Sequence, residues 1–138
     1  MARMASRTQA CGRDDASTRL AHARKFLEVA EITASEHEIP ESASVAAALA
    51  VLAGIAASDA ACCAALGTRA RGQNHHEAEK LLVQVHAGGA EAASTLRRLL
   101  DLKDTAQYGL IHVSRQRLTS ALRQASKLVQ FAADAVRR

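Results

Sequence analysis

The segment from residue 66 to residue 82, LGTRARGQNHHEAEKLL, places two arginines shortly before two adjacent histidines. A planar guanidinium donates several hydrogen bonds at once, so an arginine can hold a phosphate and stabilise negative charge developing on it. A neutral imidazole can accept a proton from a hydroxyl group near pH 7. Arg69 with His75, or Arg71 with His76, therefore has the residue types that phosphodiester cleavage needs. A solvated connection between two helices is the alternative interpretation.

An acid precedes this segment on the apolar side of the preceding predicted helix. Asp59 falls on the same helical repeat as the apolar residues of that helix, so its carboxylate should face the core. Burial of a carboxylate without a partner costs free energy, so we expect a basic partner. Arg69, ten residues onward, is one candidate partner. Lys103, which interrupts the apolar stripe of a later helix, is the other. Pairing with Arg69 would make Asp59 the acid that orients the arginine of the site. The alternative is that Asp59 has only a structural role at the end of a helical bundle.

Metal binding is a competing use of the histidines. His75 and Glu79 share a helix face at a four-residue step, but the sequence has no HExxH motif and no evident third ligand. We therefore expect neither a metal site nor another cofactor.

The cysteines predict no disulfide framework. Cys62 and Cys63 are neighbours within an apolar helix, and Cys11 lies in an N-terminal arm without hydrophobic periodicity. This usage indicates a reducing, cytoplasmic compartment. The longest apolar run, residues 45–57, is too short and too rich in alanine to span a bilayer, so we expect no membrane association.

The elements that must position these residues are helices. Asn74 followed by Glu77 resembles a capping box, which predicts a helix from His75 to about His86 and places Asn74 beside the site as a binding residue. The helix before it should begin near Ser42 or Ser44. It should end at Gly67.

Further apolar stripes at helical spacing predict a first helix from about Ala16 to the break at Pro40, a fourth reaching Gly109, and a last one capped by Ser114. Only three of the 138 residues are aromatic, which argues against a sheet core. We predict an all-α fold, an antiparallel helical bundle of four to five helices. It forms a single domain over residues 16–138, after a disordered or weakly ordered N-terminal arm over residues 1–15. The net charge of +4 is compatible with a polyanionic partner.

The order of these elements resembles the HEPN family of small α-helical proteins. The hallmark of that family is an arginine, four to six intervening residues and a histidine at such a junction. The resemblance spans roughly residues 16–136 and matches Arg69 and His75 to the motif, with Arg71 and His76 as the shifted alternative. It also matches Asp59 to the acid of the preceding helix, and Lys103 and Tyr108 to the ends of the stretch KDTAQY.

The resemblance implies a metal-independent endoribonuclease that cleaves RNA by 2′-hydroxyl attack at a site formed across a homodimer. Such a protein could serve as a toxin or phage-defence element with a cognate antitoxin or another partner protein. Active members often carry a polar residue directly after the arginine, whereas Ala70 and Gly72 follow here. The alternative is a catalytically inactive HEPN-like module that binds nucleotide, RNA or a partner protein.

Overall fold

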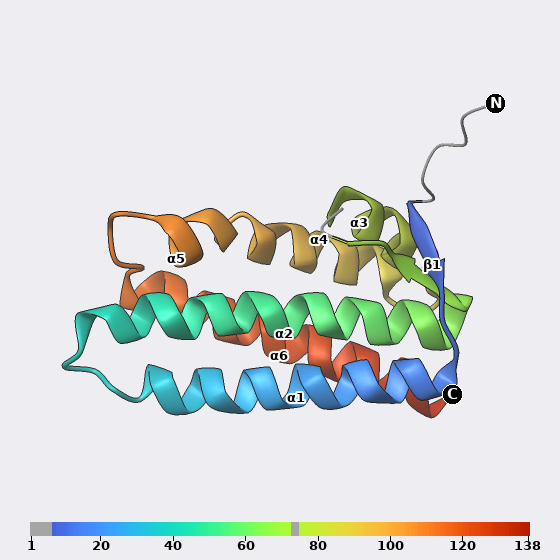
Figure 1. Ribbon diagram of the computed structural model, residues 1–138, viewed down its shortest axis with the longest axis horizontal. Helices are drawn as coiled ribbons and strands as arrows, with labels where there is room; N and C mark the ends of the chain where they lie inside the picture. Colours follow the sequence, from blue (N-terminus) through green and yellow to red (C-terminus); the bar gives the residue numbers. More distant parts are fainter. Residues whose placement is uncertain (1–6, 73–74) are drawn as a thin grey trace.

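The computed structural model describes residues 7–72 and 75–138, which form six helices and one small two-stranded sheet. The long helices lie along the long axis of the bundle, and the small sheet lies at one end (Figure 1). This confirms the predicted all-α helical bundle in its main features. The elements in chain order are β1 (Thr8–Ala10), α1 (Arg13–Ala34), α2 (Pro40–Leu66), β2 (Thr68–Ala70), α3 (His75–Val83), α4 (Gly89–Leu100), α5 (Lys103–Tyr108) and α6 (Arg115–Arg137).

The central helix is α2, which runs antiparallel to α1 with α6 behind it and α4 and α5 along its other side (Figure 1). Its small side chains let neighbouring helices come close. A Cβ atom built on Gly54 would lie 2.4 Å from Leu99 Cδ2 and 3.2 Å from Leu128 Cδ1. The sequence predicted this close approach from small residues at every fourth position, and all of them are buried: Ala46, Ala50, Gly54, Ser58 and Cys62.

The apolar repeat of Val45, Leu49 and Leu52 in the sequence predicts a stripe of α2 that faces the core, but this part of the stripe faces solvent. Val45 is 50% exposed and Leu52 is 36% exposed. Neighbouring helices surround the alanine-rich sides of α2, where backbones can approach most closely, and this leaves the bulkier stripe uncovered. We call it the outer face of α2 and define it by Val45, Ala48, Leu49, Leu52 and Ile55.

Several helix ends differ from the predicted ones. Pro40 does not merely break the chain but is the first residue of α2, where its missing N–H costs nothing. Ser44 accepts a hydrogen bond from the Val113 amide instead of capping α2. The predicted fourth helix is divided at residues 101–102 into α4 and α5. Ser114 caps α6 as expected, because its side chain accepts from the Arg117 amide.

The predicted disordered arm over residues 1–15 is wrong for residues 7–15. Strand β1 pairs antiparallel with β2, with Gln9 opposite Arg69, and α1 already begins at Arg13. A disulfide between Cys11 and Cys63 fixes this strand to the end of α2, so the expectation of no disulfide is also wrong. Three residues are too short to show a strand pattern in sequence, and the two cysteines come within Cα–Cα 5.3 Å only through the fold.

Among the described helices, α2 has the length and composition that could cross a membrane, but 67% of its most apolar window is buried inside the bundle. Core helices of soluble proteins meet the same test. The burial of α2 is therefore consistent with a soluble protein.

Candidate functional site

Asp59 is the anchor of a charged cluster at the end of α2. Its Oδ2 accepts a hydrogen bond from Arg69 Nη1 at 3.0 Å and another from Arg19 Nε at 3.0 Å. The predicted contact with Arg69 is therefore present, whereas Lys103, the other candidate partner, forms no ion pair with Asp59. The residue is only 8% exposed. One buried carboxylate thus fixes two guanidiniums.

Burial raises the pKa of the Asp59 carboxyl, and the charges and hydrogen bonds of Arg19 and Arg69 oppose that rise. The carboxylate therefore depends on these two cations to remain ionised inside the bundle. Because both arginine side chains are still partly exposed, at 24% and 32%, the cluster opens to solvent on its cationic side.

Strand β1 holds Arg69 from the side opposite Asp59. Gln9 faces Arg69 across the two-stranded sheet, and its Oε1 accepts from Arg69 Nε at 3.3 Å and from Arg69 Nη2 at 3.1 Å. Gln9 thus occupies the Nε–Nη2 edge, one of the two edges with which an arginine grips a phosphate in bidentate fashion. One N–H on each Nη atom of Arg69 is left over for a ligand.

His75 is the first residue of α3 and lies beside the same acid. With Asp59, Ser58 and Leu96 it lines a cavity of about 10 Å³ between α2, α3 and α4. Its Nε2 is buried and bonds no described group. Burial lowers the pKa of His75 below its usual 6.5 and the charge of Lys103 lowers it further, whereas Asp59 and Glu79 oppose the shift. The imidazole is therefore neutral at pH 7, the state a proton acceptor needs.

The other predicted site residues that the structure describes form no hydrogen bond or ion pair with Asp59. Arg71 and His76 are exposed, and neither pairs with Asp59. Lys103 acts on His75 only through its charge. Tyr108, the last residue of α5, is 73% exposed and shares no hydrogen bond or pocket with the cluster among the described residues. Asn74 lies outside the described residues.

The geometry thus favours one of the two arginine–histidine registers. Asp59 touches Arg69 and shares a cavity with His75, and it does neither with Arg71 or His76.

Two residues of the cluster were missed by sequence reasoning. Arg19 lies on α1, forty residues before the acid it binds, and nothing local marks it. It also contacts His22 Nδ1 at 3.2 Å. Gln9 was missed because its segment was expected to be disordered. The only usable signal was the cost of burying Asp59, which calls for more than one basic partner.

Glu79 is taken up by another interaction, so the competing metal interpretation gains no support. Its Oε1 accepts from Arg97 Nε at 2.8 Å. Within residues 7–72 and 75–138, no three histidine, cysteine, aspartate or glutamate side chains are grouped as ligands of one metal ion.

No protein-family model and no curated protein sequence matches this chain. Function must therefore be inferred from the site itself. The cluster combines a neutral imidazole, a guanidinium fixed by a buried carboxylate and a second guanidinium beside it. This combination can bind an oxyanion and accept a proton next to it.

Proposed function

We propose that this chain is a metal-independent endoribonuclease of the HEPN kind. The observation that carries the proposal is the ion pair between Asp59 and Arg69 beside His75, whose pKa is lowered. A fixed cation and a neutral proton acceptor are what an internal attack on a phosphodiester requires, since the nucleophile is the adjacent 2′-hydroxyl of the RNA itself.

In the proposed reaction His75 removes the proton of the ribose 2′-hydroxyl, and the 2′-oxygen attacks the adjacent phosphorus. Arg69 donates its remaining N–H groups to the phosphate oxygens and stabilises the added negative charge. The bond from phosphorus to the 5′-oxygen then breaks, and the departing 5′-oxygen takes up a proton from water, which leaves a 2′,3′-cyclic phosphate and a 5′-hydroxyl. Because Nε2 of His75 is buried in the observed ring orientation, we assign the proton transfer to Nδ1.

We place this reaction in a homodimer that forms on the outer face of α2. Val45 and Leu52 expose apolar surface there, and the same side of the helix continues towards Ile55 and Asp59. A second copy on this face would cover the apolar stripe and bring two charged clusters near one shared cleft. RNA is the proposed substrate, and a cognate antitoxin or other protein is the proposed regulator of a toxin or defence element. The cytoplasmic location expected from the cysteines loses its basis, because two of them form a disulfide.

A second function rests on a different observation. Gln9 already occupies one edge of Arg69, and Nε2 of His75 is turned inward, so the cluster could hold RNA or a nucleotide without cleaving it. A catalytically inactive binding module is therefore the alternative.

Incubation of the purified full chain with mixed RNA in excess chelator separates the two functions. Cleavage products that accumulate in proportion to added protein support the ribonuclease. RNA that is retained on the protein and recovered intact supports the binding module, and RNA that is neither bound nor cut contradicts both.

A further inference from the structure

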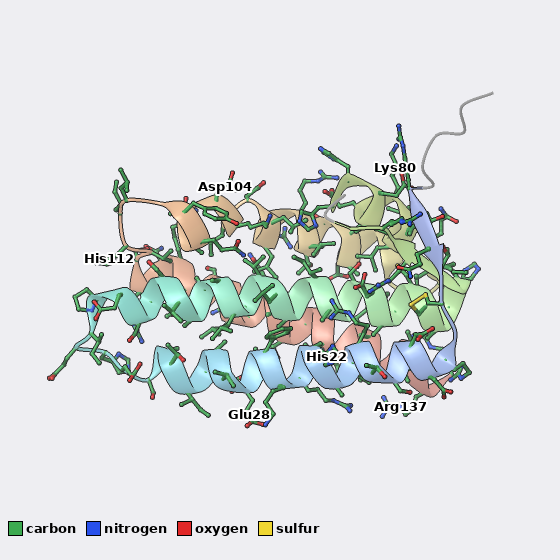
Figure 2. The ribbon with its side chains drawn as sticks, viewed as in Figure 1. His22, Glu28, Lys80, Asp104, His112 and Arg137 are labelled. Carbon is green, nitrogen blue, oxygen red and sulfur yellow. A yellow bond between two sulfur atoms is a disulfide. The ribbon has the colours of Figure 1, made fainter. Side chains whose placement is uncertain are left out.

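The disulfide lies at the point where the N-terminal strand meets the site. Cys11 directly follows β1, and Cys63 lies in the last turn of α2, one turn beyond Asp59. Figure 2 shows the sulfur–sulfur bond at the end of the bundle where β1 runs past α2. The Cys11 amide also donates to the Gly67 carbonyl at 3.0 Å. These contacts place β1 directly against the strand that carries Arg69.

Apart from the disulfide, β1 is held by its pairing with β2 and by hydrogen bonds that Arg69 and Thr68 donate to Gln9. The strand has three residues, of which Gln9 and Ala10 are exposed. A two-stranded pair of this size is marginally stable in water on its own. The covalent bond between Cys11 and Cys63 therefore adds a restraint that helps to keep Gln9 on the Nε–Nη2 edge of Arg69.

The disulfide can be reached by a small molecule. Cys11 and Cys63 form part of the wall of a surface hollow of about 160 Å³, which Arg19 and Arg69 also line. Cys11 is partly exposed whereas Cys63 is 3% exposed, so Cys11 is the more accessible of the two residues and the one we assign to attack by a thiolate. The two guanidiniums favour the approach of an anionic thiolate.

The neighbouring thiol does not compete for this bond. Cys62 is 1% exposed, and burial together with the charge of Asp59 raises its pKa to about 12. It therefore stays a buried thiol and does not attack the disulfide beside it.

We propose that the bond between Cys11 and Cys63 is a thiol-exchange site that releases β1 and so frees Arg69 to bind an RNA phosphate. A low-molecular-weight thiolate attacks Cys11 Sγ, the sulfur–sulfur bond breaks, and Cys63 leaves as a thiolate that takes up a proton. A second small thiolate then attacks the sulfur of the small molecule bound to Cys11, and Cys11 leaves as a thiolate that takes up a proton. The protein gains two thiols, and the two small thiols leave as one disulfide.

Release of β1 removes Gln9 from Arg69 and exposes the edge that a phosphate can occupy. The oxidised protein is the restrained form and the reduced protein the binding form. The tighter binding of RNA rests on the proposed function. The release of Arg69 on reduction does not depend on that function.

The test compares oxidised and reduced full-length protein in two assays. The first measures how fast phenylglyoxal, an arginine reagent, modifies Arg69, followed by peptide mass spectrometry. The second measures affinity for a fluorescein-labelled oligouridylate. Reduction should speed the modification of Arg69 severalfold and tighten RNA binding roughly tenfold, the usual effect of gaining a charge-assisted hydrogen bond.

Two variants control the comparison. Gln9→Ala should behave like the reduced protein even while the disulfide is intact, because it removes the restraining contact and no sulfur. Cys62→Ser should match wild type in both redox states.

Equal modification of Arg69 in the oxidised and reduced proteins would overturn the proposal. So would faster modification in the reduced protein and in Gln9→Ala when RNA binds these forms and the oxidised wild type with equal affinity. RNA that binds no form, while reduction still exposes Arg69, would instead contradict the proposed function and leave the thiol-controlled release supported.

Discussion

Asp59 and Arg69 are ten residues apart in the chain, and the Asp59 carboxylate accepts the Nη1 hydrogen bond of Arg69 at 3.0 Å. The contact is possible because the chain reverses direction after α2. Gly67 ends α2 with a left-handed conformation at φ 71°, and β2 then carries the chain back along the helix end. Arg69, three positions beyond the last residue of α2, therefore returns to an acid two turns before the end of that helix.

Asp59→Asn should weaken both the fold and the site. The substitution removes the charge that holds Arg19 and Arg69, and we expect the free energy of unfolding to fall by about 1–3 kcal/mol because the two partly exposed guanidiniums recover some hydration. Urea unfolding followed by circular dichroism measures this. Asp104→Asn, which changes an exposed carboxylate on α5, is the matched control and should leave stability unchanged. Equal stability of both variants would contradict an anchoring role for Asp59.

His75→Ala should separate catalysis from folding. Cleavage should fall by roughly 10²- to 10⁴-fold, the usual contribution of a positioned base. We expect stability to change by less than about 1 kcal/mol, because the ring is only half-buried and its removal also removes a buried nitrogen that has no described partner. The exposed neighbour provides the control, since His76→Ala should retain activity. Loss of activity in His76→Ala with full activity in His75→Ala would shift the site to Arg71 and His76.

Lys103→Gln should raise the pKa of His75, because the charge of Lys103 helps to lower it, and Asp59→Asn should lower that pKa further. A titration of the histidine ring followed by NMR measures both shifts.

The lowered pKa of His75 also makes stability depend on pH. The unfolded chain binds a proton near pH 6.5 and the folded chain only at lower pH, so stability falls as the pH drops below about 6.5. His75→Gln should reduce this dependence. A dependence of the same size in wild type and His75→Gln would show that His75 is not its source.

Leu52→Asp should prevent dimerisation without unfolding the chain. Leu52 is already 36% exposed on the outer face of α2, so the charge disturbs little of the core and would be buried only in a dimer. Analytical ultracentrifugation of the wild type and the variant tests this. Val83→Asp changes a more exposed apolar residue on α3, at 56%, and should leave the assembly unchanged. A wild-type monomer at tens of micromolar would remove the shared cleft from the proposed mechanism.

Gly54→Ala should destabilise the bundle by about 1–3 kcal/mol, the usual cost of overpacking a core. The new methyl group would lie 2.4 Å from Leu99, so the Leu99 and Leu128 side chains must shift. Thermal unfolding measures the loss. A stability equal to wild type would show that the packing between α2 and α4 is looser than the structure indicates.

The sequence predicted the helices well because their apolar stripes and caps are local signals. Ser114 caps α6 as expected, and Ala78, Leu81 and Leu82 of α3 are buried as predicted. The stripe of α2 was misassigned because periodicity marks an apolar face but not which neighbour covers it. Val45 and Leu52 are exposed for this reason.

The site was predicted only where its parts lie close in the chain. The pairing of Asp59 with Arg69 follows from the cost of burying an acid within reach of a nearby cation. Arg19, Gln9 and the bond between Cys11 and Cys63 depend on contacts made by distant segments, and no local pattern marks such contacts.

The chemical nature of the RNA ends tests the proposed mechanism most directly. Purified wild-type protein is incubated with a defined RNA in excess chelator, and the products are mapped at both ends, beside a copy of the RNA that carries 2′-deoxyribose at the cleaved position. We predict 2′,3′-cyclic phosphate and 5′-hydroxyl ends from the first RNA and no cleavage at the deoxy position of the second. Ends carrying a 5′-phosphate, or cleavage at the deoxy position, would contradict attack by the 2′-hydroxyl.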